Sequence, residues 1–384
     1  MSIDFYEIIR FTKSTPCDRI YEYFYAYRIK KGFGQRNMQF VAYVSTYTSK
    51  DKRGITIYDV NMETGIFTEK GKVSITNSSY LTCSHSRKYL YSITDFGVKS
   101  FHVLPDGLLE EINEASINGM RGCYLSVDYA DHFLFVSGYH DGKLTVLRLN
   151  DDGSVGEITE EIYFKGLGDV TEKSYQPHVT CAKMSRDNKY LFATDSGMDH
   201  TYVYELNHDK GTLKQVDIIR SEQNAGPRHL ITSADGKFIY IVNESANTID
   251  VFTYNMVNNY PDFEKIQSIS TLNDYHASKS ISCSLTLSAD RQHIVVTNAG
   301  DNSVAVMKRK EDGTLERILC LPVSGAYPKD ALLYPDNRHL VSLNHEAGTM
   351  TFFSTDLDKG LIYMSSKEIK IDHPNCIIFI PIEE

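Results

Sequence analysis

The sequence has no long apolar run, no closely spaced pair of cysteines and no tryptophan. Without about 20 consecutive apolar residues a membrane-spanning helix is excluded, and the opening MSIDFYEIIRFTK lacks the basic-then-apolar order of a secretory signal. The seven cysteines are scattered and odd in number, which favours free thiols in a reducing compartment over a disulfide framework or a zinc site. We therefore expect a cytoplasmic protein that does not bind membranes.

The chain has fewer basic than acidic residues: 40 Lys and Arg residues against 50 Asp and Glu residues, which gives a net charge of -10. This balance argues against nucleic acid or an anionic membrane as a partner. The sequence also lacks a glycine-rich phosphate loop, a GxSxG nucleophile elbow and a zinc motif. With 41% hydrophobic and 23% charged residues, the composition is ordinary for a globular protein with a large core.

A short apolar strand pattern recurs along the chain, often after a polar turn that contains Asp. The six clearest copies are RKYLYSITD, DHFLFVSGY, NKYLFATDS, GKFIYIVNE, RQHIVVTNA and NRHLVSLNH. Their first strand residues are expected at Tyr89, Phe133, Tyr190, Phe238, His293 and His339, at spacings of 44, 57, 48, 55 and 46 residues. A seventh copy, FVAYVSTYT, starts near Phe40. Repeats of this length are typical of the blades of a β-propeller.

Each repeat contains further strands. A tight turn follows six of the copies, at TGIF (64–67), DGLL (106–109), DGSV (152–155), KGTL (210–213), DGTL (312–315) and KGLI (359–362). Because glycine tolerates positive φ, these turns predict β-hairpins; the fifth copy has VNNYPDF instead. Another strand, such as YLTCSHS or HLITSAD, precedes the apolar repeats. Each unit therefore comprises four strands.

These patterns predict an all-β, seven-bladed β-propeller with four antiparallel strands per blade, over residues 38–384. A β-sandwich or an irregular β-protein is the alternative, but neither explains seven units of similar length. The first repeat has no preceding strand, whereas HPNCIIFIP (373–381) resembles an orphan innermost strand. We expect this C-terminal strand to join the first blade and close the ring, which removes exposed sheet edges. Residues 1–37 form an N-terminal extension outside the repeats, with no assigned function.

Propeller geometry also predicts where a site lies. The start of each innermost strand and the end of the next strand meet at the same mouth of the central channel. The innermost strands start at Tyr80, Tyr124, His178, Arg228, Cys283 and Lys329. The next strands end at Asp95, Tyr139, Asp195, Asn243 with Glu244, Asn298, and Asn344 with His345 and Glu346. This mixture of imidazoles, carboxylates, amides and cations predicts a functional site, although each residue could instead bond to a neighbouring loop.

Several segments resemble the lactonase family of seven-bladed propellers, which includes 6-phosphogluconolactonase. GPRHL (226–230) followed by ITSADGKFIYIVNES (231–245) resembles the family's GPRHL and PDGKYLYVVNE segment. QPHVT (176–180) with DSGMD (195–199), and TNAGDNSVAV (297–306), resemble its PHxH, DLGxD and NRGxDSIAV segments. The resemblance covers roughly residues 38–382 and is most specific at GPRHL followed by NE.

The resemblance implies hydrolysis of a sugar lactone, in particular of 6-phosphogluconolactone to 6-phosphogluconate in the pentose phosphate pathway. Carried over by motif, the catalytic candidates are His178, Arg228 and Glu244. The candidates for substrate binding are His229, Asn298, Lys329 and His345. Lactone hydrolysis needs a base to activate water, a donor for the developing oxyanion and a clamp for an anionic group. Glu244 or His178 would be the base, and the permanently charged Arg228 the electrophile or anion anchor.

Three positions depart from the family pattern. Thr180 replaces the second histidine of PHxH, Ala299 the arginine of NRG, and Lys329 the arginine of the later PRD motif. An anionic substrate would lose charge-assisted hydrogen bonds there, and lysine does not reproduce the bidentate arginine fork. Two alternatives therefore stay open: a muconate-type cycloisomerase, another activity of the family, and a non-catalytic propeller that binds a small anion or a protein.

The expected ligand is a small anionic sugar lactone, and the expected state is a monomer or weak homodimer. Calcium is held by some unrelated lactonase propellers, and it would find suitable oxygen ligands in Asp195, Asn243, Glu244 and Asn298. The family resembled here is not known for a required metal, so we expect no metal and no cofactor.

Overall fold

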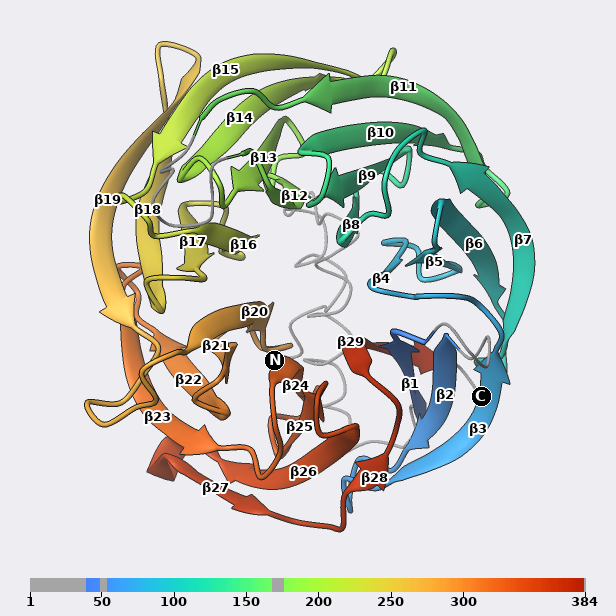
Figure 1. Ribbon diagram of the computed structural model, residues 1–384, viewed down its shortest axis with the longest axis vertical. Coiled ribbons are helices and arrows are strands. Elements are labelled where there is room, and N and C mark those ends of the chain that lie inside the picture. The colour runs from blue at the N-terminus through green and yellow to red at the C-terminus, as the bar shows by residue number, and fades with distance from the viewer. Residues whose placement is uncertain (1–38, 49–53, 168–175, 383–384) are drawn as a thin grey trace, which may run out of the picture.

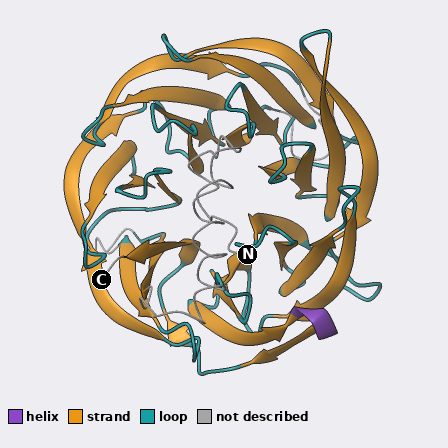
Figure 2. Cartoon of the chain, turned by 180° about the vertical axis from the view of Figure 1, so that it is seen from behind, coloured by secondary structure: helices purple, strands orange, loops and turns teal. Residues whose placement is uncertain are grey.

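The computed structural model describes residues 39–48, 54–167 and 176–382. Within these ranges the chain forms seven antiparallel sheets arranged in a ring about a central axis (Figure 1). Figure 2 shows that strands and loops make up nearly all of this part, with one short 3-10 segment, η2 (Leu357–Lys359). The predicted seven-bladed β-propeller is therefore confirmed. The predicted extension, residues 1–37, lies outside the described residues.

The blades follow one another along the chain, each built from the channel outward. The first blade contains β29 (Pro374–Ile382), β1 (Gln39–Thr46), β2 (Ile55–Val60) and β3 (Phe67–Val73). The second contains β4 (Leu81–Cys83), β5 (Tyr89–Ile93), β6 (Gly97–Val103) and β7 (Leu109–Ser116). The third contains β8 (Tyr124–Val127), β9 (Phe133–Gly138), β10 (Lys143–Leu149) and β11 (Val155–Tyr163). The fourth contains β12 (Val179–Met184), β13 (Tyr190–Asp195), β14 (His200–Asn207) and β15 (Thr212–Arg220).

The remaining blades repeat this order. The fifth contains β16 (Pro227–Thr232), β17 (Phe238–Asn243), β18 (Thr248–Val257) and β19 (Tyr260–Ser270). The sixth contains β20 (Ile281–Leu287), β21 (His293–Ala299), β22 (Ser303–Arg309) and β23 (Leu315–Pro322). The seventh contains β24 (Pro328–Leu333), β25 (His339–Asn344), β26 (Thr349–Asp356) and β27 (Leu361–Met364), with the short β28 (Ile369–Lys370) also paired to β26. In the second to seventh blades, the second strand begins at the residue that the repeat alignment predicted.

The hairpin between the third and fourth strands explains the recurring glycine. Gly153 has a φ of 80°, which suits glycine far better than other residues. A Cβ atom at this position would also lie 2.1 Å from the Tyr89 ring of the preceding blade, so the hairpin packs directly on its neighbour. The fifth blade uses Asn258 and Asn259 instead, with φ of 51° and 67°. Asparagine is among the residues that best tolerate positive φ in a two-residue hairpin turn.

The hydrophobic core is divided among the interfaces between neighbouring blades. In the described part of the chain seven buried clusters occur, and each lies mainly between two adjacent blades. At the interface of the first and seventh blades, the ring of Phe67 lies 5.1 Å from that of Phe352 and 5.8 Å from that of Tyr334. Each blade is thus stabilised by both neighbours, and a gap anywhere in the ring would expose two apolar faces.

The ring closes as the sequence predicted. β29 pairs antiparallel with β1, from Gln39 opposite Ile382 to Thr46 opposite Pro374. The buried carboxylate of Asp330, on β24, accepts the backbone N–H of Ile377 at 3.1 Å. One side chain of the seventh blade therefore ties the closing strand in place.

Deleting β29 is expected to prevent stable folding. A chain that stops after Asp372 leaves β1 as an exposed edge strand and removes the apolar residues that β29 buries. Soluble yield and thermal unfolding by circular dichroism measure the effect. A synthetic peptide of residues 373–384 added during refolding should restore some soluble protein. A truncated chain that unfolds cooperatively at the temperature of the full chain would contradict this role of β29.

Asp330 is expected to make stability fall as the pH rises. Burial raises its pKa from 3.8 to about 7, so between these values the folded state holds a proton that the unfolded state has lost. This stabilisation is complete below pH 3.8 and is lost as the pH rises through about 7. Between pH 5 and 8 the wild type should lose about 2–3 kcal/mol relative to Asp330→Asn. Urea unfolding measures the difference, with the exposed Asp262→Asn as the matched control, and parallel pH profiles of wild type and Asp330→Asn would refute it.

Candidate active site

A repeated β-bulge shapes the channel mouth. In β16, Pro227 pairs with Asn243 and His229 with Val242, so Arg228 is the extra residue. The same irregularity makes Lys329 the extra residue of β24 and Asn375 that of β29. Bulges of this kind redirect a side chain at the rim of a sheet.

Proline marks these three bulges in the sequence. β16, β24 and β29 each begin with Pro, at positions 227, 328 and 374, and the next residue is the extra one. Proline is tolerated at the first residue of a strand and at bulges because it lacks the N–H that a regular ladder requires. The Pro-Arg, Pro-Lys and Pro-Asn pairs are therefore the local signal that places these side chains at the mouth.

These three side chains line one cavity of about 220 Å³. Its other lining residues are Tyr47, Ser79, Arg121, Gly122, Cys123, His140 and His345. The cavity is smaller than the roughly 300–1,000 Å³ typical of drug-sized ligands, so it suits a small metabolite. Arg121, Arg228 and Lys329 give it three cationic groups, although the chain as a whole carries a net charge of -10.

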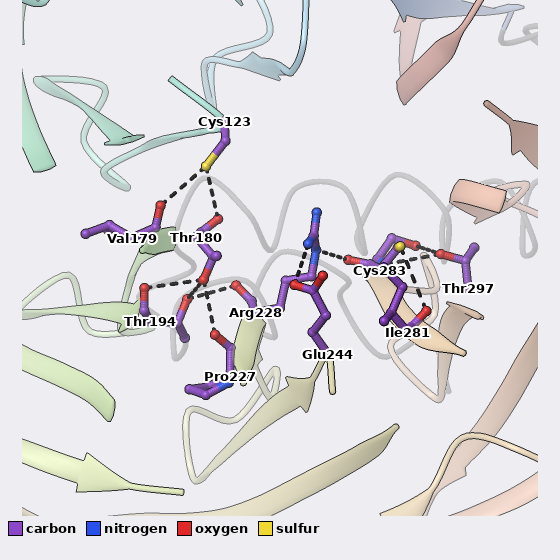
Figure 3. A network of polar contacts seen from close by, with 11 residues as sticks. Cys123, Val179, Thr180, Thr194, Pro227, Arg228, Glu244, Ile281, Cys283 and Thr297 are labelled. Atoms are coloured by element: carbon purple, nitrogen blue, oxygen red, sulfur yellow. Dashed lines mark hydrogen bonds and ion pairs between the residues drawn. The ribbon is translucent and has the colours of Figure 1, made fainter. Parts of the chain in front are cut away.

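Arg228 and Glu244 form an ion pair beside this cavity. Arg228 Nη1 lies 2.6 Å from Glu244 Oε2, and Arg228 Nε donates to the carbonyl of Cys283 at 2.9 Å (Figure 3). The two side chains are only 17% and 20% exposed. Burial alone would lower the pKa of Arg228, but the carboxylate of Glu244 outweighs it and raises that pKa. Three of the five guanidinium N–H groups have no partner among the described residues.

Local backbone contacts fix the position of this pair. The N–H of Glu244 donates to the carbonyl of Gly226 at 2.6 Å, and Gly226 has a φ of 67°, in the left-handed region. Asp199 accepts the N–H of Gly226 at 2.8 Å and that of Asn224 at 2.7 Å. The GPRHL segment is thus held by the neighbouring fourth blade, and Asp199 serves it as a turn-forming residue.

Lys329 contributes an uncompensated positive charge. Within the described part of the chain its Nζ makes no hydrogen bond or ion pair, and it lies 5.4 Å from the centre of the Tyr327 ring. Burial, and then the nearby Arg228, lower the pKa of Lys329. Burial followed by Lys329 also lowers the pKa of His345, whose Nδ1 lies 3.3 Å from the carbonyl oxygen of Pro374. A neutral His345 with that N–H donated leaves its other ring nitrogen as an acceptor.

His178 lies in a defined environment beside the mouth but is not among the residues that line the cavity. Its ring stacks on Tyr139 at 4.1 Å, and Nδ1 lies 2.7 Å from the carbonyl oxygen of Tyr139. Because a carbonyl only accepts, Nδ1 carries the hydrogen and the neutral ring offers its Nε2 lone pair. The structure therefore provides a fixed tautomer that could act as a base, but it does not bring His178 into contact with Arg228 or Glu244.

Two other candidates for substrate binding, His229 and Asn298, are not among the residues that line the cavity. The ring of His229 lies 5.0 Å from that of Tyr124 and 6.2 Å from that of Tyr80, and burial followed by Arg228 lowers its pKa well below the ordinary value. Asn298 is fully buried, and its amide bonds to Thr271, Ser282 and Ser303. The hydrogen bonds of Asn298 are those of a structural side chain, and neither His229 nor Asn298 lines the cavity.

Thr180, which replaces the second histidine of the family's PHxH motif, has a structural role. It is the extra residue of a bulge in β12, equivalent to Arg228 in β16. Its hydroxyl lies 2.9 Å from Thr194 Oγ1 and donates to the carbonyl of Pro227 at 3.1 Å (Figure 3). Thr180 therefore connects the fourth and fifth blades and carries no charge into the channel.

The polar lining residues that the sequence analysis missed include Tyr47, Arg121, His140 and Asn375. Arg121 lies in the loop before β8, and Tyr47 directly follows the end of β1. His140 lies two residues after the end of β9, and Asn375 is the extra residue of β29. Asn375 could have been found, because HPN repeats the Pro-X signal of GPR and YPK. The other three lie in loops just outside the strand ends, where no residue pattern defines the direction of a side chain.

Two other features do not offer chemistry comparable to the Arg228–Glu244 pair: a second cavity, near Lys99, and the thiol of Cys123 in the cavity at the channel mouth. A cavity of about 240 Å³ between the first two blades contains one cation, Lys99, which is paired with Glu111 and Glu114. Cys123 lines the main cavity, but burial raises its pKa to about 12, so it remains a thiol rather than a nucleophilic thiolate. Within residues 39–48, 54–167 and 176–382, no cluster of three or more His, Cys, Asp or Glu side chains is arranged to hold a metal, and no helix is long and apolar enough to span a membrane.

The fold and this site define a seven-bladed propeller with a cationic cavity at one mouth of its channel. The model of a family described as "Lactonase, 7-bladed beta-propeller" matches residues 41–379. The chain therefore belongs to the lactonase family of seven-bladed β-propellers, as the sequence motifs indicated.

Relatives of known name and structure agree with this placement. The chain is 27% identical to a 6-phosphogluconolactonase of Bacillus subtilis (strain 168), over 89% of this chain and 99% of that protein. It is 30% identical to an uncharacterized protein of Staphylococcus epidermidis, over 88% and 99%. The solved structure of the periplasmic gluconolactonase of Pseudomonas aeruginosa matches with a TM-score of 0.82 at 24% identity, over 90% of this chain and 99% of that one. This last likeness supports the fold.

The Arg228–Glu244 pair is expected to stabilise the folded protein cooperatively. Arg228→Met and Glu244→Gln should each lower the free energy of unfolding by about 1–3 kcal/mol, because each leaves a half-buried charge without its partner. The double variant should lose less than the sum of the two, as urea unfolding will measure. The exposed pair Lys310 and Glu316 provides a control cycle, with an expected coupling below about 0.5 kcal/mol. Strict additivity at Arg228 and Glu244 would contradict the pairing.

Proposed function

We propose that this protein hydrolyses the ring of an anionic sugar lactone, and that 6-phosphogluconolactone is its substrate. The observation that carries the proposal is the Arg228–Glu244 pair beside Lys329 at a small cavity, in a member of the lactonase family. The name of the Bacillus subtilis relative supports the choice of substrate.

The residues fit the three tasks of the reaction. Glu244 removes a proton from water, and the resulting hydroxide attacks the lactone carbonyl carbon. Negative charge then develops on the carbonyl oxygen, where the unpartnered N–H groups of Arg228 and the Lys329 ammonium stabilise it. The bond from carbon to the ring oxygen breaks, and the departing oxygen takes back the proton that Glu244 had removed from water, which yields the open hydroxy acid and restores the carboxylate. His178 and His345 are the alternative bases, and of these two His345 lines the cavity.

The charge balance of the cavity favours an anionic substrate. Arg121, Arg228 and Lys329 bring three positive charges, while Glu244 and Asp95 return two negative ones. A substrate with a phosphate group supplies the missing negative charge. Arg121 thus offers an arginine near the mouth, although the family arginines at positions 299 and 329 are absent.

The cellular setting remains a prediction. The six cysteines in the described part of the chain form no disulfide, which supports a reducing compartment such as the cytoplasm. The proposed substrate, 6-phosphogluconolactone, would place the protein in the pentose phosphate pathway. We also propose that the protein is a monomer or a weak homodimer in solution.

The proposal is tested by following hydrolysis of freshly made 6-phosphogluconolactone, coupled to 6-phosphogluconate dehydrogenase, against a blank for spontaneous hydrolysis. Arg228→Met and Glu244→Gln should each lower the turnover number by about 10²–10³, because one removes an oxyanion donor and the other the base. Glu157→Gln removes an exposed carboxylate on an outer strand and should retain the wild-type rate.

Wild-type turnover no faster than the blank would reject this activity. A cycloisomerase or a non-catalytic propeller that binds a small anion or a protein would then be the leading hypothesis. Thr180 and Ala299, where this chain lacks the family's imidazole and arginine, would account for the missing activity.

A further inference from the structure

Arg121 is the one cation of the cavity that neither the catalytic pair nor the strand-start pattern explains. We propose that Arg121 binds the phosphate group of the substrate and thereby sets a preference for phosphorylated over unphosphorylated sugar lactones. The inference rests on the proposed lactonase function and names the residue that selects among its substrates.

The guanidinium of Arg121 is oriented by one neighbour, and its nearest carboxylate is too distant to form a hydrogen bond with it. It lies 4.5 Å from the centre of the Tyr47 ring, and its Nη2 donates to the Tyr47 hydroxyl. Its Nη1 is 3.8 Å from Asp95 Oδ1, which is too long for a hydrogen bond. The side chain is 22% exposed and lines the cavity. Several of its five N–H donors are therefore open to a ligand.

Asp95 is already occupied by other donors. Asn77 Nδ2 donates to Asp95 Oδ1 at 2.6 Å. Burial works against the charged form, but the hydrogen bonds from Asn77 and Thr76 outweigh it and lower the pKa of Asp95. Asp95 thus stays ionised, and its Oδ1 accepts a hydrogen bond from Asn77 rather than from Arg121. An incoming phosphate, with its charge and bidentate geometry, would be the better partner for the guanidinium.

Arg121 lies away from the reacting pole of the cavity. Arg228 and Lys329 come from β16 and β24, in the fifth and seventh blades, whereas Arg121 belongs to the loop between the second and third blades. Figure 1 shows β8, which follows this loop in the chain, across the ring from β24. A sugar lactone could place its carbonyl at Arg228 and its terminal phosphate at Arg121. The two cationic poles match a ligand that is charged at one end and reacts at the other.

The loop that presents Arg121 is held on its N-terminal side. The fully buried Lys143 donates from Nζ to the carbonyl of Ile117. The N–H of Met120 donates to Asp141 Oδ2 at 3.0 Å. These contacts fix the backbone up to the residue before Arg121, so the guanidinium is preorganised rather than carried on a loose loop.

The test compares two substrates, 6-phosphogluconolactone and glucono-δ-lactone, in the wild type and in Arg121→Gln. The variant should lose about 10–100-fold in kcat/KM for the phosphorylated lactone, because a charge-assisted contact is removed. The loss should fall mainly on KM, since binding rather than ring opening is affected. For glucono-δ-lactone kcat/KM should change less than about threefold. Arg121→Lys, which keeps the charge without the planar fork, should restore part of the preference.

A control variant separates this effect from a general loss of charge. Arg148→Gln removes one arginine whose side chain bonds to Glu157 on the outer part of the third blade, and it should keep the wild-type preference. Circular dichroism melting curves verify that Arg121→Gln folds. A folded Arg121→Gln that keeps the wild-type preference would overturn the anchor role while leaving lactonase activity intact.

If neither lactone is hydrolysed, the proposed function is wrong, but a binding measurement still tests the role of Arg121. Isothermal titration calorimetry then compares 6-phosphogluconate with gluconate. Tighter binding of 6-phosphogluconate that disappears in Arg121→Gln would support the phosphate anchor. Equal affinity of wild type and Arg121→Gln for 6-phosphogluconate would overturn it.

Discussion

The pairing of β1 with β29 is the constraint on which the rest of the structure depends. It makes the last described strand of the chain the innermost strand of the first blade, so that seven innermost strands surround one channel. Closure also completes the cavity, since Tyr47 follows β1 and Asn375 belongs to β29. A ring with each core cluster between two blades gives these strand ends a rigid frame. The site is therefore a consequence of closure and not of any single blade.

The charged side chains at the channel mouth determine which ligands this rigid frame can bind. Burying cations is costly unless partners compensate them, and the chain provides Glu244 for Arg228 and a more distant Asp95 for Arg121. Lys329 has no such partner in the described part of the chain, and both burial and Arg228 lower its pKa. The cavity is thus short of one negative charge. That imbalance, set in a protein with a net charge of -10, is the basis for the small anionic ligand that we propose, and the carbonyl of the proposed lactone would find two donors there.

Sequence predicted the scaffold well because its signals are local. The repeated apolar strands gave the starts of six second strands, and the hairpin glycines follow from their positive φ and close packing. Arg228, Lys329 and His345 were found because strand ends meet at one mouth. The same rule also selected Asn298, which is buried in structural hydrogen bonds. Arg121 was missed because the direction of a loop side chain depends on contacts such as Tyr47, which lies 74 residues away in the sequence.

The most direct test of the central claim is a crystal structure of the protein with 6-phosphogluconate, the product of the proposed reaction. The account predicts the ligand in the cavity at the channel mouth, with its carboxylate at Arg228 and Lys329 and its phosphate at Arg121. A ligand bound elsewhere, for example in the cavity that contains Lys99, would contradict the assignment of the site. Binding in the reverse direction, with the phosphate at Arg228, would keep the site but contradict the division of its two cationic poles.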